Sequence, residues 1–202
     1  MNKVVLASAS PRRRYLLAAL GIDFDVCAAD IEECDTGGAP AAIVEANARA
    51  KCHAVAPQTH DETLIIAADT LVFLDGTALS KPANMEEARA MLGRLAGNTH
   101  QVVTGLALLD KGTGRTAIGS ESTDVTFRTL TAEEINRFVE TVRPLDRAGA
   151  YTVDGPGSLL VSRYDGCYQN VLGLPIVRLD KLMRALGYSL FDMIEPDKAR
   201  FL

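Results

Sequence analysis

The sequence predicts an α/β fold, a mixed twisted sheet covered by helices. Two observations lead to this class. Strand-like and helical patterns alternate along the 202 residues, and the clearest helices show a capping residue followed by apolar side chains at helical spacing. A chain of this length buries about 70% of the surface that its unfolded form exposes, so we expect a single domain over residues 1–202 that needs no zinc or disulfide to fold.

The first part of the chain predicts a strand followed by a capped helix. Residues 4–7 are apolar and predict a short buried strand. Ser10 and Pro11 then supply a helix N-cap and a proline at the first helical position. Leu17 and neighbouring leucines form the buried side of this helix, and Gly21 ends it.

The next segments predict a strand at residues 24–27 and a helix over residues 41–56, which has Asn47 and Lys51 on the flank of its apolar stripe. Residues 64–68 are a continuous apolar run, the pattern of a central strand. We expect this strand to end at Asp69-Thr70, before a second short strand at 71–74 and a hairpin turn at Asp75-Gly76.

The remaining elements follow from caps and alternation. Asn84 with Glu87 opens a helix that ends at residue 95, and Thr131 with Glu134 opens another that ends at residue 142. The other predicted strands and the last helix share apolar patterning without such caps. The strands cover residues 101–109, 122–127, 151–153 and 159–164, and the helix covers residues 180–186.

Composition and charge exclude several classes of protein. Apolar residues make up 48% and no apolar run approaches the roughly 20 residues of a membrane span, so we expect no membrane partner. The net charge of -5 would repel a nucleic acid polymer. The N-terminus lacks a secretory signal, which favours a cytoplasmic protein. The cysteines and histidines lack metal-ligand spacing, so we expect free thiols and no zinc centre.

Residues 8–14 combine a strand-to-helix junction with three arginines. The positive end of a helix already favours anions, and arginines there are unfavourable unless an anion lies between them. Ser8, Ser10, Arg12 and Arg13 are therefore candidates to bind phosphate. A solvated basic patch is the alternative.

Carboxylates supply the other candidates. Asp69 follows a buried strand, where α/β proteins form ligand crevices, although such a residue also caps turns. The Glu32-Glu33 pair offers hard oxygen ligands for a divalent cation, unless it is merely solvated in its loop. Lys81 precedes a proline and a helix cap and is a further candidate for phosphate, or an ordinary exposed lysine.

The order of these features resembles the Maf family of nucleotide pyrophosphatases from residue 6 to about residue 186. The stretches that carry the resemblance are LASASPRR at 6–13, IEE at 31–33, ADT at 68–70, SKP at 80–82, GNTHQVVTGLAL at 97–108, TDVTFRTLT at 123–131, DRAGAY at 146–151 and NVLGLP at 170–175. The resemblance implies a fold of two lobes with a central cleft, like that of the inosine triphosphate pyrophosphatases. The boundary between the lobes is not visible in the sequence.

The resemblance also implies hydrolysis of a nucleoside triphosphate to the monophosphate and pyrophosphate with Mg²⁺ or Mn²⁺. Asp69 would act as the general base and, with Glu33, as a metal ligand. The triphosphate would be held by Arg13, Lys51 and Lys81, with further hydrogen bonds from Ser8 and Ser10. Base selection would involve Arg12, Thr70 and Asp154.

The branch of the family that acts on dTTP and UTP carries SPRR, ADT and DKAGAY, which this chain follows as SPRR, ADT and DRAGAY. We therefore expect dTTP and UTP as substrates. Asp154 stands where that branch has Gln, which keeps 7-methyl-GTP or another modified nucleotide as an alternative. Tyr15 and Ser80 also depart from the usual residues of the family.

A nucleotide-binding regulator of septum formation is the non-enzymatic alternative. A pure binder has no need of a carboxylate that activates water, so Asp69 and Glu33 favour the enzyme. The sequence leaves open whether the chain forms a homodimer, which metal it prefers, and whether its role is nucleotide housecleaning or septum regulation.

Overall fold

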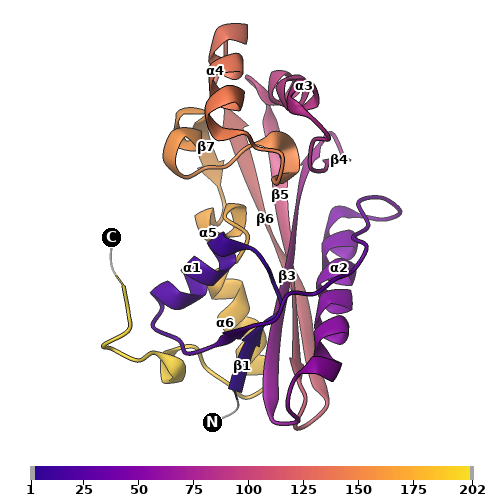
Figure 1. Ribbon diagram of the computed structural model, residues 1–202, viewed down its shortest axis with the longest axis vertical. Helices are drawn as coiled ribbons and strands as arrows, with labels where there is room; N and C mark the ends of the chain where they lie inside the picture. Colours follow the sequence, from indigo (N-terminus) through magenta and orange to yellow (C-terminus); the bar gives the residue numbers. More distant parts are fainter. Residues whose placement is uncertain (1–2, 201–202) are drawn as a thin grey trace.

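The computed structural model describes residues 3–200; the remaining four residues of the predicted domain, 1–2 and 201–202, lie outside this part (Figure 1). The strands are β1 (Lys3–Leu6), β2 (Asp25–Val26), β3 (Thr63–Leu74), β4 (Thr77–Leu79), β5 (Thr99–Asp110), β6 (Arg115–Phe127) and β7 (Val161–Asp165). The helices are α1 (Pro11–Ala19), α2 (Pro40–Val55), α3 (Met85–Leu95), α4 (Ala132–Val142), α5 (Tyr168–Val171) and α6 (Ile176–Ala185).

All strands join one mixed sheet in the order β2-β1-β3-β5-β6-β7, with β4 paired to the edge of β3. β1 runs parallel to β2 and β3, whereas β3, β5, β6 and β7 pair antiparallel. The long strands β3, β5 and β6 extend through the molecule, with α2 on one side, α1 and α6 on the other, and α3 and α4 at the far end (Figure 1). The predicted fold class is confirmed.

Side-chain alternation along β3 divides its residues between two faces of the sheet. Leu64, Ile66 and Ala68 pack in a core with α1 and α6, whereas Ile65 and Ala67 pack against α2. A further core closes the far end under α3 and α4. Because the alternation continues past residue 68, consecutive polar residues of β3 must point to opposite faces.

The prediction that the strand ends at Asp69-Thr70 is wrong. β3 is continuous from Thr63 to Leu74 and pairs with β5 without a break, from Leu64 opposite Asp110 to Phe73 opposite Gln101. Cross-strand pairing along the whole of β5 outweighs the local preference of two polar residues for a turn. The predicted Asp75-Gly76 hairpin is confirmed, with both residues at positive φ.

The other edge of β3 is interrupted. β1 pairs with β3 only as far as Leu6 opposite Ile66, and β4 begins to pair at Leu79 opposite Val72. The middle of β3 is therefore bordered by a strand on one side only. This notch between β1 and β4 leaves one edge of the central strand β3 without a neighbouring strand in the middle of its length.

The capped helices are confirmed by their hydrogen bonds. The Asn84 side chain accepts from the Glu87 backbone N–H, and Thr131 and Glu134 form a reciprocal capping box. Predictions that rested on alternation alone need correction. β6 begins at residue 115, because it pairs along all of β5. α6 begins at residue 176. Residues 151–153 form no strand, because they link two 3₁₀ turns. α5 was not predicted.

The four cysteines are free thiols, as predicted, and burial raises the pKa of Cys52 to about 12. No helix within residues 3–200 is both long and apolar enough to cross a membrane.

Candidate active site

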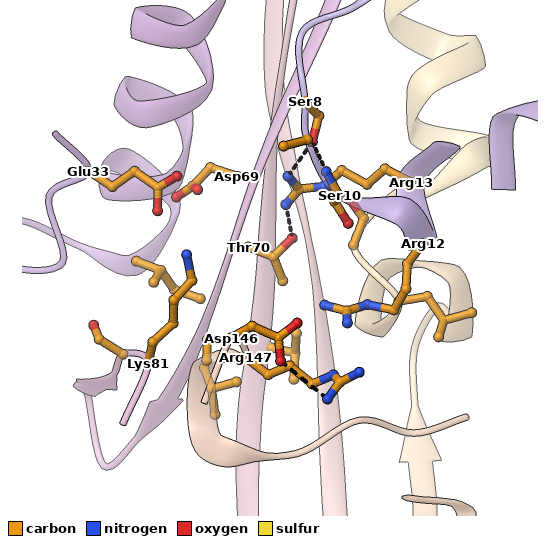
Figure 2. Close-up of a pocket in the computed structure, with 18 of the residues that line it drawn as sticks. Ser8, Ser10, Arg12, Arg13, Glu33, Asp69, Thr70, Lys81, Asp146 and Arg147 are labelled. Carbon is orange, nitrogen blue, oxygen red and sulfur yellow. Dashed lines mark hydrogen bonds and ion pairs between the residues drawn. The ribbon is translucent and has the colours of Figure 1, made fainter. Parts of the chain in front are cut away.

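A cleft of about 570 Å³ opens at the notch between β1 and β4. It is lined by all of the predicted site residues except Asp154. They are Ser8, Ser10, Arg12 and Arg13 from the β1–α1 junction, Glu33 from the loop before α2, Lys51 from α2, Asp69 and Thr70 from β3, and Lys81 from the loop after β4 (Figure 2). Five segments of the chain thus contribute charged or hydroxyl side chains to one cleft.

Asp69 lies on the face of β3 that packs against α2, and its side chain is 4% exposed. Lys51 Nζ is 2.7 Å from Asp69 Oδ1, and Asn47 donates a hydrogen bond of 2.8 Å to Asp69 Oδ2. Asn47 and Lys51 are four residues apart on α2, so they lie on the same side of the helix. Both carboxylate oxygens of Asp69 are therefore fixed by one helix.

Glu33 reaches the same point from the loop before α2. Lys51 Nζ is 2.7 Å from Glu33 Oε1, so the carboxylates of Glu33 and Asp69 converge on one ammonium group. Two convergent carboxylate oxygens around a stand-in cation are donors that suit Mg²⁺ or Mn²⁺. Within residues 3–200 no group of three or more His, Cys, Asp or Glu side chains gathers in this way, so other ligands of a metal would have to come from elsewhere.

Arg13 is fixed on the opposite face of β3. Its guanidinium donates to the Gly173 carbonyl at 2.8 Å, to Ser8 Oγ at 3.1 Å and to Thr70 Oγ1 at 2.8 Å. Burial lowers the pKa of Arg13, and the charge of Asp69 opposes this effect. Arg13 therefore acts as a rigid positive charge that also positions Ser8 and Thr70.

The remaining residues predicted to bind the nucleotide, Ser10, Lys81 and Arg12, are held less firmly than Arg13. Ser10 occupies the N-cap position of α1, yet in the described structure its side chain makes no capping hydrogen bond. Lys81 is exposed and points toward Glu33 in Figure 2. Burial lowers the pKa of Arg12, and the nearby charge of Arg147 adds to this effect. An anion in the cleft would relieve the repulsion between these two guanidinium groups.

The sequence matches the family model described as Maf-like protein over residues 3–186. The chain belongs to the Maf family. It is 44% identical over 190 residues to "dTTP/UTP pyrophosphatase" of Pelotomaculum thermopropionicum, covering 94% of this chain and 99% of the relative. It is 45% identical over 195 residues to a protein of the same name from Moorella thermoacetica, covering 96% and 100%. The solved Ham1 protein of Staphylococcus aureus matches with 18% identity and a TM-score of 0.45, covering 62% of this chain and 71% of that one.

Asn47, which lies behind the cleft lining and contacts Asp69, and Arg147, which lines the cleft, were not predicted as site residues. Asn47 holds Asp69 and also exchanges two hydrogen bonds with the Cys34 backbone, at 3.0 Å and 2.7 Å, so it ties the Glu33 loop to the carboxylate. Its spacing of four residues from Lys51 was the available signal. Arg147 lines the cleft, and its Nε is buried without a hydrogen-bond partner among the described residues. No sequence pattern singled it out beyond its place in DRAGAY.

Asp154 lies outside the lining of the Maf cleft. It is exposed and accepts a hydrogen bond from Thr152, whereas Thr152 and Val153 line the cleft. The carboxylate is thus adjacent to the cleft. A direct contact between Asp154 and a base stays a prediction.

Proposed function

We propose that this Maf protein hydrolyses nucleoside triphosphates to the monophosphate and pyrophosphate, with dTTP and UTP as preferred substrates. The observation that carries the proposal is the fixed, buried carboxylate of Asp69 in a cleft that also holds Arg12, Arg13 and Lys81. A carboxylate near bound phosphate is able to take a proton from water, and the cations compensate the charge of the triphosphate. The names of the relatives support the choice of pyrimidine nucleotides.

In the proposed reaction, a water oxygen attacks the α-phosphorus and Asp69 accepts a proton from that water. The bond between the α-phosphorus and the bridging oxygen breaks, and pyrophosphate leaves. Arg13 contributes a fixed positive charge beside the phosphates, while Lys81 is free to follow them because it is exposed. Glu33 and Asp69 would hold Mg²⁺ or Mn²⁺, which would polarise the phosphate oxygens when bound.

A substrate panel tests this proposal. Pyrophosphate release is measured with canonical nucleoside triphosphates, 7-methyl-GTP and other modified nucleotides in the presence of Mg²⁺ or Mn²⁺. We expect the highest kcat/KM for dTTP and UTP. If 7-methyl-GTP or another purine nucleotide were preferred by more than tenfold, the pyrophosphatase reaction would still be supported, but the assignment of pyrimidine substrates would be rejected. If every nucleotide bound without release of pyrophosphate, the alternative of a nucleotide-binding regulator of septum formation would be favoured instead.

Replacing a cation that is proposed to bind the phosphates should lower kcat/KM for all nucleotides by a similar factor. Lys81→Ala should lower kcat/KM by roughly 10- to 100-fold for every nucleotide, because the phosphates are common to all of them. Arg13→Ala should have the same uniform effect and should also lower the melting temperature, because it removes three hydrogen bonds. Lys181→Ala, on the exposed side of α6, is the control of equal charge. A changed base preference at unchanged efficiency would contradict the assignment.

Asp154→Gln should raise kcat/KM for dTTP or UTP relative to 7-methyl-GTP. An amide both donates and accepts and so matches a uracil or thymine edge, whereas a carboxylate only accepts. The ratio of kcat/KM values is the measurement, and Asp165→Asn, an exposed site on β7, is the control. If the ratio does not change, Asp154 has no part in base selection.

A further inference from the structure

Lys51 is the only described cation that contacts both carboxylates of the proposed metal site. Its ammonium group lies 2.7 Å from Glu33 Oε1 and 2.7 Å from Asp69 Oδ1, and its side chain is 8% exposed. It also approaches the Ala68 carbonyl at 3.4 Å. The lysine therefore neutralises two carboxylates that would otherwise repel each other, the buried one of Asp69 and the 40% exposed one of Glu33.

A metal ion held by the same two oxygens would have to lie between them, where Lys51 Nζ lies. Two cations at this position would repel each other strongly, because the ammonium group of Lys51 and the carboxylate of Asp69 are buried and only Glu33 is exposed to water. A metal can therefore enter only if the ammonium group moves away. The flexible stem of lysine permits this movement, provided that another anion receives the charge.

The nucleotide supplies what the free protein lacks. Mg²⁺ in proteins is commonly bound by one or two carboxylates together with phosphates of the substrate. Glu33 and Asp69 offer only these two side chains, and residues 3–200 add no third acidic or imidazole ligand to the cluster. A triphosphate in the cleft would bring oxygen ligands for the metal and, at the same time, a new partner for Lys51.

We propose that Lys51 occupies the metal position in the nucleotide-free protein and moves to the triphosphate when the metal enters with the nucleotide. This role rests on the proposed function and deepens it. It goes beyond a simple phosphate contact, because it makes Lys51 and the metal competitors for Glu33 and Asp69 in the absence of substrate. The free protein should therefore bind divalent metal weakly.

The test is Mn²⁺ binding to the protein without nucleotide. Binding is measured by isothermal titration calorimetry and by the electron paramagnetic resonance signal of Mn²⁺. Lys51→Met removes the competing charge and should bind Mn²⁺ at least about tenfold more tightly than the wild type, even though its turnover is impaired. Without metal its melting temperature should fall below the wild-type value, because Glu33 and Asp69 lose their shared partner. Mn²⁺ should then raise its melting temperature more than that of the wild type.

Lys111→Met is the matched control. Lys111 is a partly buried lysine that bonds the Ala56 and Thr59 carbonyls at 2.9 Å and 2.6 Å, and it does not line the cleft. This variant loses the same charge and should bind Mn²⁺ as the wild type does. Lys51→Arg keeps a cation between the carboxylates and should bind Mn²⁺ no more tightly than the wild type.

The proposal is overturned if Lys51→Met binds Mn²⁺ with wild-type or lower affinity, or if neither protein binds it at millimolar concentration. If Lys51→Met does not fold, Lys51→Gln is measured with the same expected and overturning results. These readouts need no turnover. A wild-type protein that releases no pyrophosphate would therefore reject the proposed reaction and leave the competition between Lys51 and metal to be judged by Mn²⁺ binding alone.

Discussion

Asp69→Asn should abolish turnover while leaving nucleotide affinity within a few fold of the wild-type value. The amide keeps the shape of the side chain but cannot accept a proton from water, and loss of one general base lowers the rate by roughly 10²–10⁴. The measurement is kcat at saturating nucleotide and metal, together with the dissociation constant of the nucleotide. If the variant kept more than a tenth of the wild-type kcat, Asp69 would not be the general base.

The hydrogen bonds of Asp69 define the control for this experiment. In the wild type both oxygens accept, one from Lys51 and one from Asn47, so an amide nitrogen at residue 69 would face a donor. Asp69→Asn combined with Asn47→Asp restores a donor–acceptor pair between residues 47 and 69, but it removes the donor that Asn47 offers to the Cys34 carbonyl. We expect the double variant to recover only part of the lost thermal stability, because the Cys34 carbonyl has lost its donor, and to stay inactive. Recovery of activity would show that the single variant failed for structural reasons.

Features of the fold that depend on local interactions could be predicted from the sequence. Asn84 and Thr131 cap their helices through hydrogen bonds to residues three positions ahead, and such contacts follow from spacing alone. The break predicted at Asp69 failed for the opposite reason. Whether a polar pair ends a strand depends on what lies beside it, and here β5 pairs across that position throughout.

The same distinction applies to the site. The acidic and basic side chains could be proposed as site residues from their chemistry and local sequence, and the family resemblance assigned a role to each. The role of Asn47 depends on two contacts that are distant in sequence, the Cys34 backbone and Asp69. The burial of Arg147 Nε likewise depends on segments that are distant in the sequence and pack around it. Neither arrangement has a local pattern, so only the folded structure could reveal it.

Gly105 on β5 explains how α2 comes close enough to the sheet to fix Asp69. It lies directly opposite Asp69 in the antiparallel register. A Cβ atom at this position would come within 2.3 Å of the Val44 carbonyl carbon and oxygen and 2.6 Å of Glu45 N, all backbone atoms of α2. A helix backbone cannot yield as a flexible side chain can. The absence of a side chain at residue 105 therefore sets the distance between α2 and β3.

Gly105→Ala should push α2 away from the sheet and reduce both stability and turnover. Overpacking of this kind costs about 1–3 kcal/mol in the free energy of unfolding, and a displacement of about 1 Å at a catalytic group lowers the rate by roughly 10²-fold. The measurements are the melting temperature and kcat well below it, where the variant is folded. Gly93→Ala, on α3, is the control, because a Cβ there meets no atom within 4 Å and alanine favours the helix. Unchanged kcat in Gly105→Ala would mean that Asn47 and Lys51 do not need this close approach to hold Asp69 for catalysis.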